Sequence, residues 1–306
     1  MLLERMASEL DVPVGYIAGL AQSASHRYKT YGVPKRSGGV RVIHHPSREL
    51  KALQRWLLRN VLAGLPVHAA ATAYQPTDTI LENAAQHASS RFLLRMDIKN
   101  FFPSITANDL RLFLDRRSHS HFGQWTARDR YIFVQLVCRH GALTIGAPTS
   151  PTLSNALCFD LDVRLAGIAE ANGATYTRYA DDLFFSTTQP NILSSVEAEV
   201  ERCCEQLDLP GNLRINKAKT RHSSKNGVRR VTGIILGSDG NTYVGRKYKR
   251  RIRAMIHKLD TLSREELASL SGLIAYVIGF DKPFLNSLVK KYGPERVRVA
   301  RFPKFN

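Results

Sequence analysis

Two segments with the composition of β-strands, residues 175–178 and 183–187, flank the sequence Tyr179-Ala180-Asp181-Asp182. This arrangement predicts a hairpin with acidic residues at its turn. Two neighbouring carboxylates are then fixed at one edge of a sheet, where hard divalent cations find the oxygen ligands that they prefer. The segment therefore predicts a sheet with an acidic site at its edge.

A third acidic residue ends an alternating segment, residues 92–98. Apolar residues occupy its even-numbered positions, so the side chain of Asp97 is expected on the opposite face of the strand from Met96 and Ile98. An isolated acidic residue in such a place is usually solvated. If the strand neighbours the hairpin in one sheet, however, the carboxylates meet, and two Mg²⁺ ions about 3.5–4 Å apart are able to support nucleotidyl transfer there.

The charge of the chain indicates a polyanionic partner. Its 306 residues contain 44 Lys and Arg against 26 Asp and Glu, which gives a net charge of +18 and a pI near 10. Nucleic acid is the first candidate and a membrane surface the second. Residues 241–306 hold 15 Lys and Arg against 5 Asp and Glu, so this segment is expected to clamp nucleic acid.

The sequence predicts a cytoplasmic protein that does not cross a membrane. The longest apolar segment, residues 270–280, is too short for a bilayer span, and the charged residues 1–10 do not resemble a secretory signal. The cysteines lack the CxxC spacing of a zinc site and are expected to be buried thiols. They are Cys138, Cys158, Cys203 and Cys204.

Strands mixed with helices up to about residue 240, followed by helical sequence, predict an α+β fold with a C-terminal helical lobe. Continuous helices are expected over residues 47–65, 153–168 and 196–207, and a second hairpin from residues 231–236 and 242–244.

Three segments occur in the order of the A, B and C motifs of reverse transcriptases. They are Arg95-Met96-Asp97-Ile98-Lys99-Asn100-Phe101-Phe102, then Gly146-Ala147-Pro148-Thr149-Ser150-Pro151 with Ser154-Asn155, and Tyr179-Ala180-Asp181-Asp182. The chain resembles this family over residues 30–245. The resemblance implies a right-hand fold of fingers, a palm with an antiparallel sheet and a helical thumb, and it implies RNA-directed synthesis of DNA from deoxynucleoside triphosphates. The division that it implies is N-terminal helices and fingers over 1–90, a palm over 91–240 with inserted finger helices at about 106–147, and a basic helical thumb over 241–306.

Two further segments resemble signatures of the retron reverse transcriptases, namely Asn83-Ala84-Ala85-Gln86-His87 and Val231-Thr232-Gly233. Asn83 and His87 are also compatible with two ordinary polar positions on one helix face. The resemblance implies a cognate structured noncoding RNA, priming from a 2′-hydroxyl of that RNA, a branched RNA–DNA product (msDNA), and an accessory effector protein in antiphage defence. RNA or primer binding is expected at Asn83, His87, Val231, Thr232, Gly233, Lys247, Arg250 and Arg251.

The resemblance also implies roles at the polymerase site. Asp97 and Asp181 are expected to bridge two Mg²⁺ ions, with the Ile98 carbonyl as a further ligand and Asp182 in support. Lys219 matches the lysine that protonates the departing pyrophosphate, although Lys217 is close enough to exchange with it.

The nucleotide-binding residues expected from the resemblance come from three segments. Lys35, Arg36 and Arg41 belong to the basic finger segment, and Arg41 is the first choice because a guanidinium chelates two phosphate oxygens. Phe102 matches the aromatic steric gate against ribonucleotides, with a core role as the alternative. The motif B loop contributes Gly146 and Ala147, but Ile145 replaces the glutamine of many relatives and removes its side-chain hydrogen bonds.

Other functions remain open from the sequence. One alternative is a reverse transcriptase of the group II intron or diversity-generating type. The absence of maturase and endonuclease segments argues against the intron type. The other is an RNA-binding scaffold that retains the hand fold without catalysis, against which the three aspartates argue.

Overall fold

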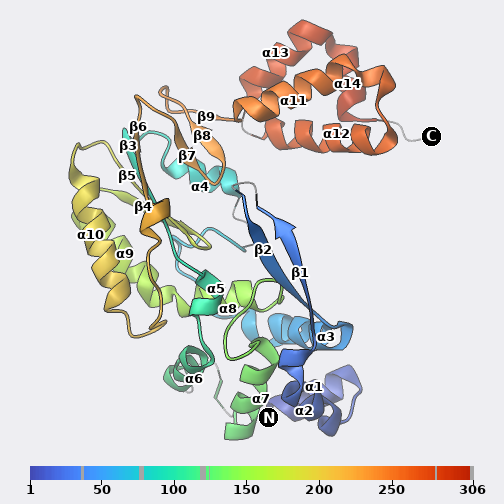
Figure 1. Ribbon diagram of the computed structural model, residues 1–306, viewed down its shortest axis with the longest axis vertical. Helices are drawn as coiled ribbons and strands as arrows, with labels where there is room; N and C mark the ends of the chain where they lie inside the picture. Colours follow the sequence, from blue (N-terminus) through green and yellow to red (C-terminus); the bar gives the residue numbers. More distant parts are fainter. Residues whose placement is uncertain (36–37, 76–78, 118–121, 124, 280, 304–306) are drawn as a thin grey trace.

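The computed structural model describes residues 1–35, 38–75, 79–117, 122–123, 125–279 and 281–303. Its central element is an antiparallel sheet, here called the palm sheet, with the strand order β4-β5-β3-β6 (Figure 1). The strands are β3 (Phe92–Asp97), β4 (Thr175–Tyr179), β5 (Asp182–Thr187) and β6 (Arg221–Ser224). The strand that ends at Asp97 is therefore a direct neighbour of the hairpin.

The alternation in β3 separates two environments. Leu94 and Met96 are fully buried in the main hydrophobic core on one face, whereas Arg95 on the other face is exposed. Asp97 shares the face of Arg95, because side chains alternate along a strand. The periodicity of the sequence thus correctly predicted which way Asp97 points.

Different elements cover the two faces of the palm sheet (Figure 1). The helices α9 (Phe159–Ala171) and α10 (Ile192–Glu205) pack on one face. The helix α4 (Ile80–Gln86) packs on the other face, together with a small sheet of strand order β7-β8-β9. These strands are β7 (Arg229–Val231), β8 (Ile234–Leu236) and β9 (Thr242–Tyr243).

Helices and a two-stranded antiparallel ribbon form a further region, here called the fingers. The ribbon is formed by β1 (Tyr28–Pro34) and β2 (Val40–Pro46). The helical elements are α1 (Leu2–Leu10), α2 (Val14–Gln22), η1 (Ala24–His26), α3 (Arg48–Leu57), the π-turn η2 (Leu58–Leu62), α6 (Ala107–Arg116) and α7 (Ala127–Val137). Their apolar faces join those of the palm in one core that extends from Leu2 to Leu213.

Two local predictions were wrong in detail. The continuous helix expected over residues 153–168 is divided into α8 (Ser150–Leu157) and α9, because Cys158 has a ψ angle of 7° and ends the first helix. The segment 231–236 is not one strand either. Thr232 and Gly233 have φ angles of 48° and 91°, so the backbone turns between β7 and β8.

The C-terminal segment forms a helical bundle with its own core, called the thumb helices here. They are α11 (Arg246–His257), η4 (Leu259–Thr261), α12 (Arg264–Ile278), α13 (Lys282–Tyr292) and α14 (Pro294–Arg301). Ile252 and Ile256 are fully buried on one side of α11, whereas Lys247, Arg250 and Arg251 are exposed. This amphipathic arrangement agrees with the apolar stripe in the sequence.

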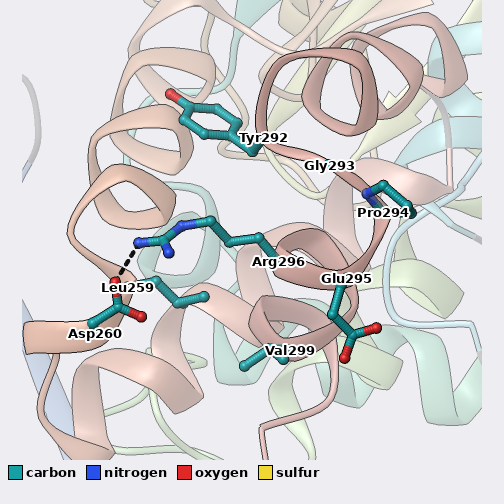
Figure 2. Close-up of a pocket in the computed structure, with 8 residues that line it drawn as sticks. All are labelled: Leu259, Asp260, Tyr292, Gly293, Pro294, Glu295, Arg296 and Val299. Atoms are coloured by element: carbon teal, nitrogen blue, oxygen red, sulfur yellow. Dashed lines mark hydrogen bonds and ion pairs between the residues drawn. The ribbon is translucent and has the colours of Figure 1, made fainter.

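A shallow pocket of about 390 Å³ lies within the thumb helices, between η4 and the turn from α13 to α14 (Figure 2). Arg296 crosses it and forms an ion pair of 2.7 Å with Asp260. All of the residues that line this pocket belong to the thumb, so it is not part of the acidic site.

Two other expectations concern cysteines and membranes. The four cysteines are free and buried thiols, as the sequence suggested. Within the described part of the chain, no helix combines the length and the apolar composition that a bilayer span requires.

Candidate active site

The palm sheet brings the three aspartates to one end. Asp97 is the last residue of β3 and lies directly opposite Asp182, the first residue of β5. Ala180 has a φ angle of 58° and turns the backbone between β4 and β5. The backbone N–H of Ile98 donates a 2.8 Å hydrogen bond to the carbonyl of Asp181, which ties this turn to the end of β3.

A lysine and an asparagine hold the carboxylate of Asp97. The ammonium of Lys219 lies 2.9 Å from Oδ1 and 2.8 Å from Oδ2 of Asp97, and Asn216 donates to Oδ1 at 3.2 Å. Both come from the segment around the short helix η3 (Lys217–Lys219). Lys217 instead pairs with Glu201 at 2.8 Å, so Lys219 is the lysine that faces the acidic site.

Asp182 is engaged by an arginine from the neighbouring strand. Arg95 donates from Nε to Oδ1 at 3.0 Å, and from Nη2 to Oδ1 at 2.8 Å and to Oδ2 at 3.0 Å. The planar guanidinium thus donates hydrogen bonds to both oxygens of Asp182, a geometry that fixes the orientation of a carboxylate.

The electrostatics of the site favour added positive charge. Burial raises the pKa of Asp181, and the charge of Asp97 raises it further, while Lys219 and Arg41 oppose the shift. Burial also raises the pKa of Asp182, against the opposing effect of Arg95. A cation bound between these groups would offset both the desolvation and the like-charge repulsion.

The donor atoms fit a magnesium site, although they do not form a ready-made cage. Within the described residues, no group of three or more His, Cys, Asp and Glu side chains is arranged to hold a metal ion. Lys219 and Arg95 occupy oxygens of Asp97 and Asp182. Mg²⁺ is usually bound by one or two carboxylates together with substrate phosphates, so a site completed only by the substrate is chemically consistent with this arrangement.

The basic finger residues lie on the ribbon. Arg41 is an exposed residue of β2, and its charge acts on Asp181. Lys35 is exposed at the end of β1, where its N–H donates to the Gly39 carbonyl at 2.9 Å. Arg36 lies outside the described residues.

The motif B loop packs directly against this ribbon. The N–H of His44 in β2 donates to the carbonyl of Ile145 at 2.8 Å. Gly146 has a φ angle of 111°, and a Cβ atom there would lie 2.4 Å from the His44 carbonyl oxygen, so only glycine fits. Ala147 is buried beside it. The backbone of Ile145 therefore anchors the loop to the fingers whatever its side chain contributes.

The two phenylalanines after Asp97 have different environments. In the short helix α5 (Phe101–Ser104), Phe101 is buried in the core, whereas Phe102 is only partly buried. The ring of Phe102 lies 6.5 Å from the ring of Tyr74, centroid to centroid. Phe102 thus remains the candidate for a steric gate, and Phe101 takes the core role.

Tyr74 is a candidate site residue that the sequence did not reveal. Its side chain is 48% exposed, its φ angle is 67°, and its phenol is near enough to Asp181 for that charge to raise its pKa, after the larger effect of burial. A single tyrosine in an irregular segment has no periodicity or motif that would single it out. Only its position beside Phe102 and Asp181 does so.

Asn83 and His87 are in the interior, which corrects the expectation that their side chains face RNA. Both are fully buried under the palm sheet. His87 forms 2.8 Å hydrogen bonds with Ser186 and Thr177, and Thr177 donates to Asn83 at 2.6 Å. Burial lowers the pKa of His87 to about 4, so its ring is neutral near pH 7. These bonds tie the end of α4 to β4 and β5.

The Val231-Thr232-Gly233 segment forms the turn between β7 and β8. Val231 is fully buried, and the hydroxyl of Thr232 donates to the Ile80 carbonyl at 3.3 Å. The turn is thus attached to the first residue of α4. Of the three residues, Val231 is placed to support this hairpin from inside the core.

Comparisons with known proteins agree with the motifs. The model of the family described as reverse transcriptase (RNA-dependent DNA polymerase) matches residues 33–247. The retron Mx65 reverse transcriptase of Myxococcus xanthus is 37% identical over 294 residues, which cover 90% of this chain and 67% of the relative. The retron Ec86 reverse transcriptase of Escherichia coli is 32% identical over 308 residues, with 98% and 93% of the two chains covered.

A solved structure of telomerase from Candida albicans, in complex with a fragment of telomeric RNA, has a TM-score of 0.50 and 12% sequence identity. The match covers 91% of this chain and 61% of the solved chain, so the present chain spans less than two thirds of it. This likeness concerns the fold alone. Together with the family match, it confirms the α+β, right-hand polymerase fold predicted from the motifs, and the chain belongs to the reverse transcriptase family, as a member of the retron RNA-directed DNA polymerases.

Proposed function

We propose that the chain reverse transcribes its own structured noncoding RNA, starting from a 2′-hydroxyl of that RNA and producing branched RNA–DNA. The observation that supports catalysis most directly is the pairing of Asp97 with Asp182 across β3 and β5, with the Asp181 carbonyl bonded to Ile98. These two contacts bring the three aspartates together at one end of the palm sheet, in a chain that belongs to the retron family. The proposal places the enzyme in the cytoplasm, where deoxynucleoside triphosphates and the RNA are available.

Asp97, Asp181 and the Ile98 carbonyl would hold two Mg²⁺ ions, with Asp182 in support. These ions supply activation of the attacking hydroxyl and stabilisation of the leaving pyrophosphate. The hydrogen bond from the Ile98 N–H to the Asp181 carbonyl supports the role of Ile98, because it places this residue beside the turn that carries Asp181. Lys219, already at the site, would donate a proton to the pyrophosphate.

The incoming nucleotide would lie between the acidic site and the finger ribbon. Arg41 and Lys35 would bind its phosphates, and Phe102 would exclude a ribose 2′-hydroxyl with Tyr74 beside it. Gly146 and Ala147 would shape the floor of this site. The close approach of Gly146 to β2 supports that role, since it joins the loop to the ribbon that carries Arg41.

RNA and primer would be held mainly by the thumb helices. Lys247, Arg250 and Arg251 are exposed on α11 and suited to phosphate contacts that position a duplex without reading its sequence. The hairpin turn at Thr232 and Gly233 would contact the primer. An accessory effector protein and a role in antiphage defence complete the proposal by analogy with the family.

The experiment that tests catalysis is primer extension on an RNA template with Mg²⁺, using the wild type, Asp97→Asn and Asp181→Asn. Each substitution removes metal-binding charge and little of the +18 field, so extension is expected to disappear while RNA binding persists. Extension near the wild-type rate by either variant would remove the metal assignment. If the wild-type protein binds RNA but extends no primer, the result would instead favour an RNA-binding scaffold without catalysis.

Sequencing the nucleic acid that copurifies with the protein tests the retron product. A DNA strand joined to an internal 2′-hydroxyl of one RNA is the expected finding. Linear complementary DNA from many RNAs would argue against self-priming on a cognate RNA.

A further inference from the structure

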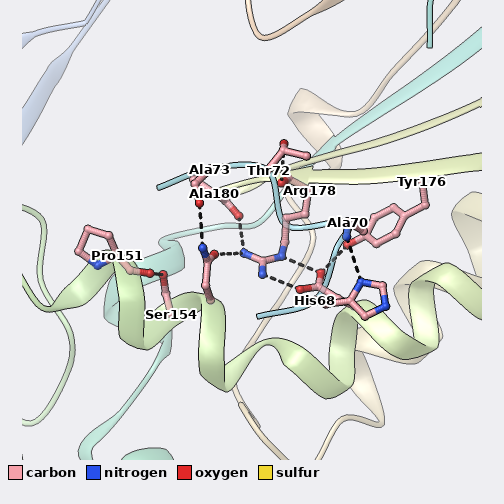
Figure 3. A network of polar contacts seen from close by, with 11 residues as sticks. His68, Ala70, Thr72, Ala73, Pro151, Ser154, Tyr176, Arg178 and Ala180 are labelled. Atoms are coloured by element: carbon pink, nitrogen blue, oxygen red, sulfur yellow. Dashed lines mark hydrogen bonds and ion pairs between the residues drawn. The ribbon is translucent and has the colours of Figure 1, made fainter. Parts of the chain in front are cut away.

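A fully buried ion pair joins Arg178 in β4 to Asp162 in α9, and β4 leads into the turn that carries Asp181. Figure 3 shows Arg178 with the polar contacts of its guanidinium. Arg178 in β4 donates from Nε to Oδ1 of Asp162 at 2.8 Å and from Nη2 to Oδ2 at 2.6 Å. Neither side chain has any exposed surface, and Tyr176 adds a 2.8 Å hydrogen bond to Asp162. Such pairs contribute little net stability, because removing two charges from water offsets most of their attraction. Fold stability alone therefore does not explain this pair.

The remaining guanidinium nitrogen connects the ion pair to two backbone turns. Nη1 of Arg178 lies 3.1 Å from Oδ1 of Asn155 and 3.4 Å from the Ala180 carbonyl. Asn155 in turn donates from Nδ2 to the Ala73 carbonyl at 2.8 Å (Figure 3). Ala180 immediately precedes Asp181, and Ala73 immediately precedes Tyr74.

Both turns have backbone conformations that need support. Ala180 and Tyr74 have φ angles of 58° and 67°, a region that residues with a Cβ atom rarely adopt. Conformations of this kind persist where the surroundings over-determine them. Arg178 also pairs through its backbone, accepting from the Thr72 N–H at 2.9 Å and donating to the Ala70 carbonyl at 2.7 Å.

We propose that Arg178, held by Asp162, is a positioning residue for Asp181, and that it acts through the Ala180 carbonyl and through Asn155. The same network fixes Tyr74 relative to Asp181 by way of the Ala73 carbonyl. The inference rests on the proposed function, in which Asp181 binds the catalytic metal. A displacement of about 1 Å at a reacting centre costs roughly 10²-fold in rate, so loosening this turn is expected to be visible in kinetics.

The test compares Asp162→Asn and Asn155→Ala with a matched control in the full-length protein. Asp162→Asn leaves the guanidinium without its charged partner. Asn155→Ala keeps the ion pair and the contact of Arg178 with the Ala180 carbonyl, and it removes the link from Arg178 to the Ala73 carbonyl. The control is Asp129→Asn in the fingers. Asp129 is equally buried and bonded, accepting from the Thr126 N–H and from the Leu3 N–H at 3.0 and 3.1 Å, but these bonds lie in the fingers.

The unfolding temperature of each variant is measured first. Four quantities are then measured at a temperature where the variant is folded: the maximal single-turnover extension rate, the Mg²⁺ concentration at half of that rate, Mn²⁺ binding by electron paramagnetic resonance, and primer–template affinity. We expect Asp162→Asn and Asn155→Ala to lower the rate about tenfold or more. They should also raise the Mg²⁺ requirement and weaken Mn²⁺ binding, with primer–template affinity unchanged. Asp129→Asn should lower the unfolding temperature without changing the metal dependence.

The proposal would be overturned if the folded Asn155→Ala and Asp162→Asn variants kept the wild-type rate and metal dependence. It would also be overturned if Asp129→Asn changed the metal dependence as much as these two variants do. If Asp162→Asn does not fold, Arg178→Lys takes its place, because the single nitrogen of a lysine keeps a positive charge for Asp162 but cannot also bond Asn155 and the Ala180 carbonyl. Asp181→Asn serves as the reference. Normal extension by Asp181→Asn would reject the proposed metal site itself. An inactive Asp181→Asn, together with unaffected Asn155→Ala and unaffected Asp162→Asn or Arg178→Lys, would reject only the positioning role.

Discussion

The ammonium of Lys219 bridges both carboxylate oxygens of Asp97, at 2.9 and 2.8 Å. The lysine side chain is 59% exposed, whereas the carboxylate is 7% exposed, so the lysine covers Asp97 from the solvent side. A metal ion that binds Asp97 must therefore share or displace this contact. Lys219 would then be free to reach the phosphates of a bound nucleotide.

Replacing Lys219 with Ala should have opposite effects on metal binding and on extension. Without nucleotide, Mn²⁺ should bind more tightly, because a competing positive charge has been removed from Asp97. Extension should slow by about 10²-fold, the lower range for loss of a general acid. Electron paramagnetic resonance and single-turnover extension measure the two effects. Lys217→Ala is the control, since Lys217 pairs with Glu201; equal effects in both variants would contradict the assignment of Lys219.

Replacing Phe102 with Ala should admit ribonucleotides. The half-buried ring lies beside Tyr74, and shortening it opens space without touching the carboxylates. The ratio of matched ribonucleotide to deoxynucleotide incorporation is the measurement. Phe101→Leu provides the control, because Phe101 is buried and its substitution should reduce stability without changing the ratio. Unchanged discrimination in Phe102→Ala would assign Phe102 to packing alone.

Replacing Arg250 and Arg251 together with Ala should weaken binding of cognate and unrelated structured RNA alike. Each lost phosphate contact reduces the slope of log affinity against log salt by about 0.7 to 0.9, so the loss of two contacts should reduce the slope by up to about 1.4 to 1.8. Binding is measured at several salt concentrations with the cognate RNA and a scrambled RNA of equal length. Arg298→Ala should change the slope less, since Arg298 is paired with Glu295. A selective loss of cognate binding would show that the arginines read sequence or shape.

Replacing His87 with Gln should flatten the dependence of stability on pH. The native pKa of about 4 lies below the ordinary 6.5, so the unfolded chain takes up the proton first as the pH falls. His87 therefore leaves stability unchanged above pH 6.5 and lowers it between pH 6.5 and 4. The loss is about 2 kcal/mol at pH 5 and roughly 3 kcal/mol in full.

Urea unfolding at pH 7.5 and at pH 5 measures this difference for the wild type and His87→Gln. The exposed His257→Gln variant is the control and should retain the wild-type pH dependence. The burial of Asn83 and His87 also predicts that their variants lose branched-product formation and ordinary primer extension together. Selective loss of the branched product would restore a direct role in RNA selection.

The sequence by itself determined the local settings of the three aspartates. Period-two alternation placed Asp97 opposite Met96, and the flanking β segments placed Asp181 in a hairpin turn. Asp182, expected in the same turn, is instead the first residue of β5. These features depend on residues that are close together in the chain. Over such short segments, the backbone geometry of a strand determines to which side each side chain points. The order of the motifs then identified the family.

Only the tertiary structure decided which polar residues face the site. Asn83 and His87 share a helix face, but their partners Thr177 and Ser186 lie about 90 to 100 residues further along the sequence. No pattern in the residues near Asn83 and His87 predicts contacts with segments so far away in the sequence. The same holds for Lys219 beside Asp97 and for Arg178 between Asn155 and Asp162. Buried polar groups require hydrogen-bond partners, and the packing of distant segments determines which partners they find.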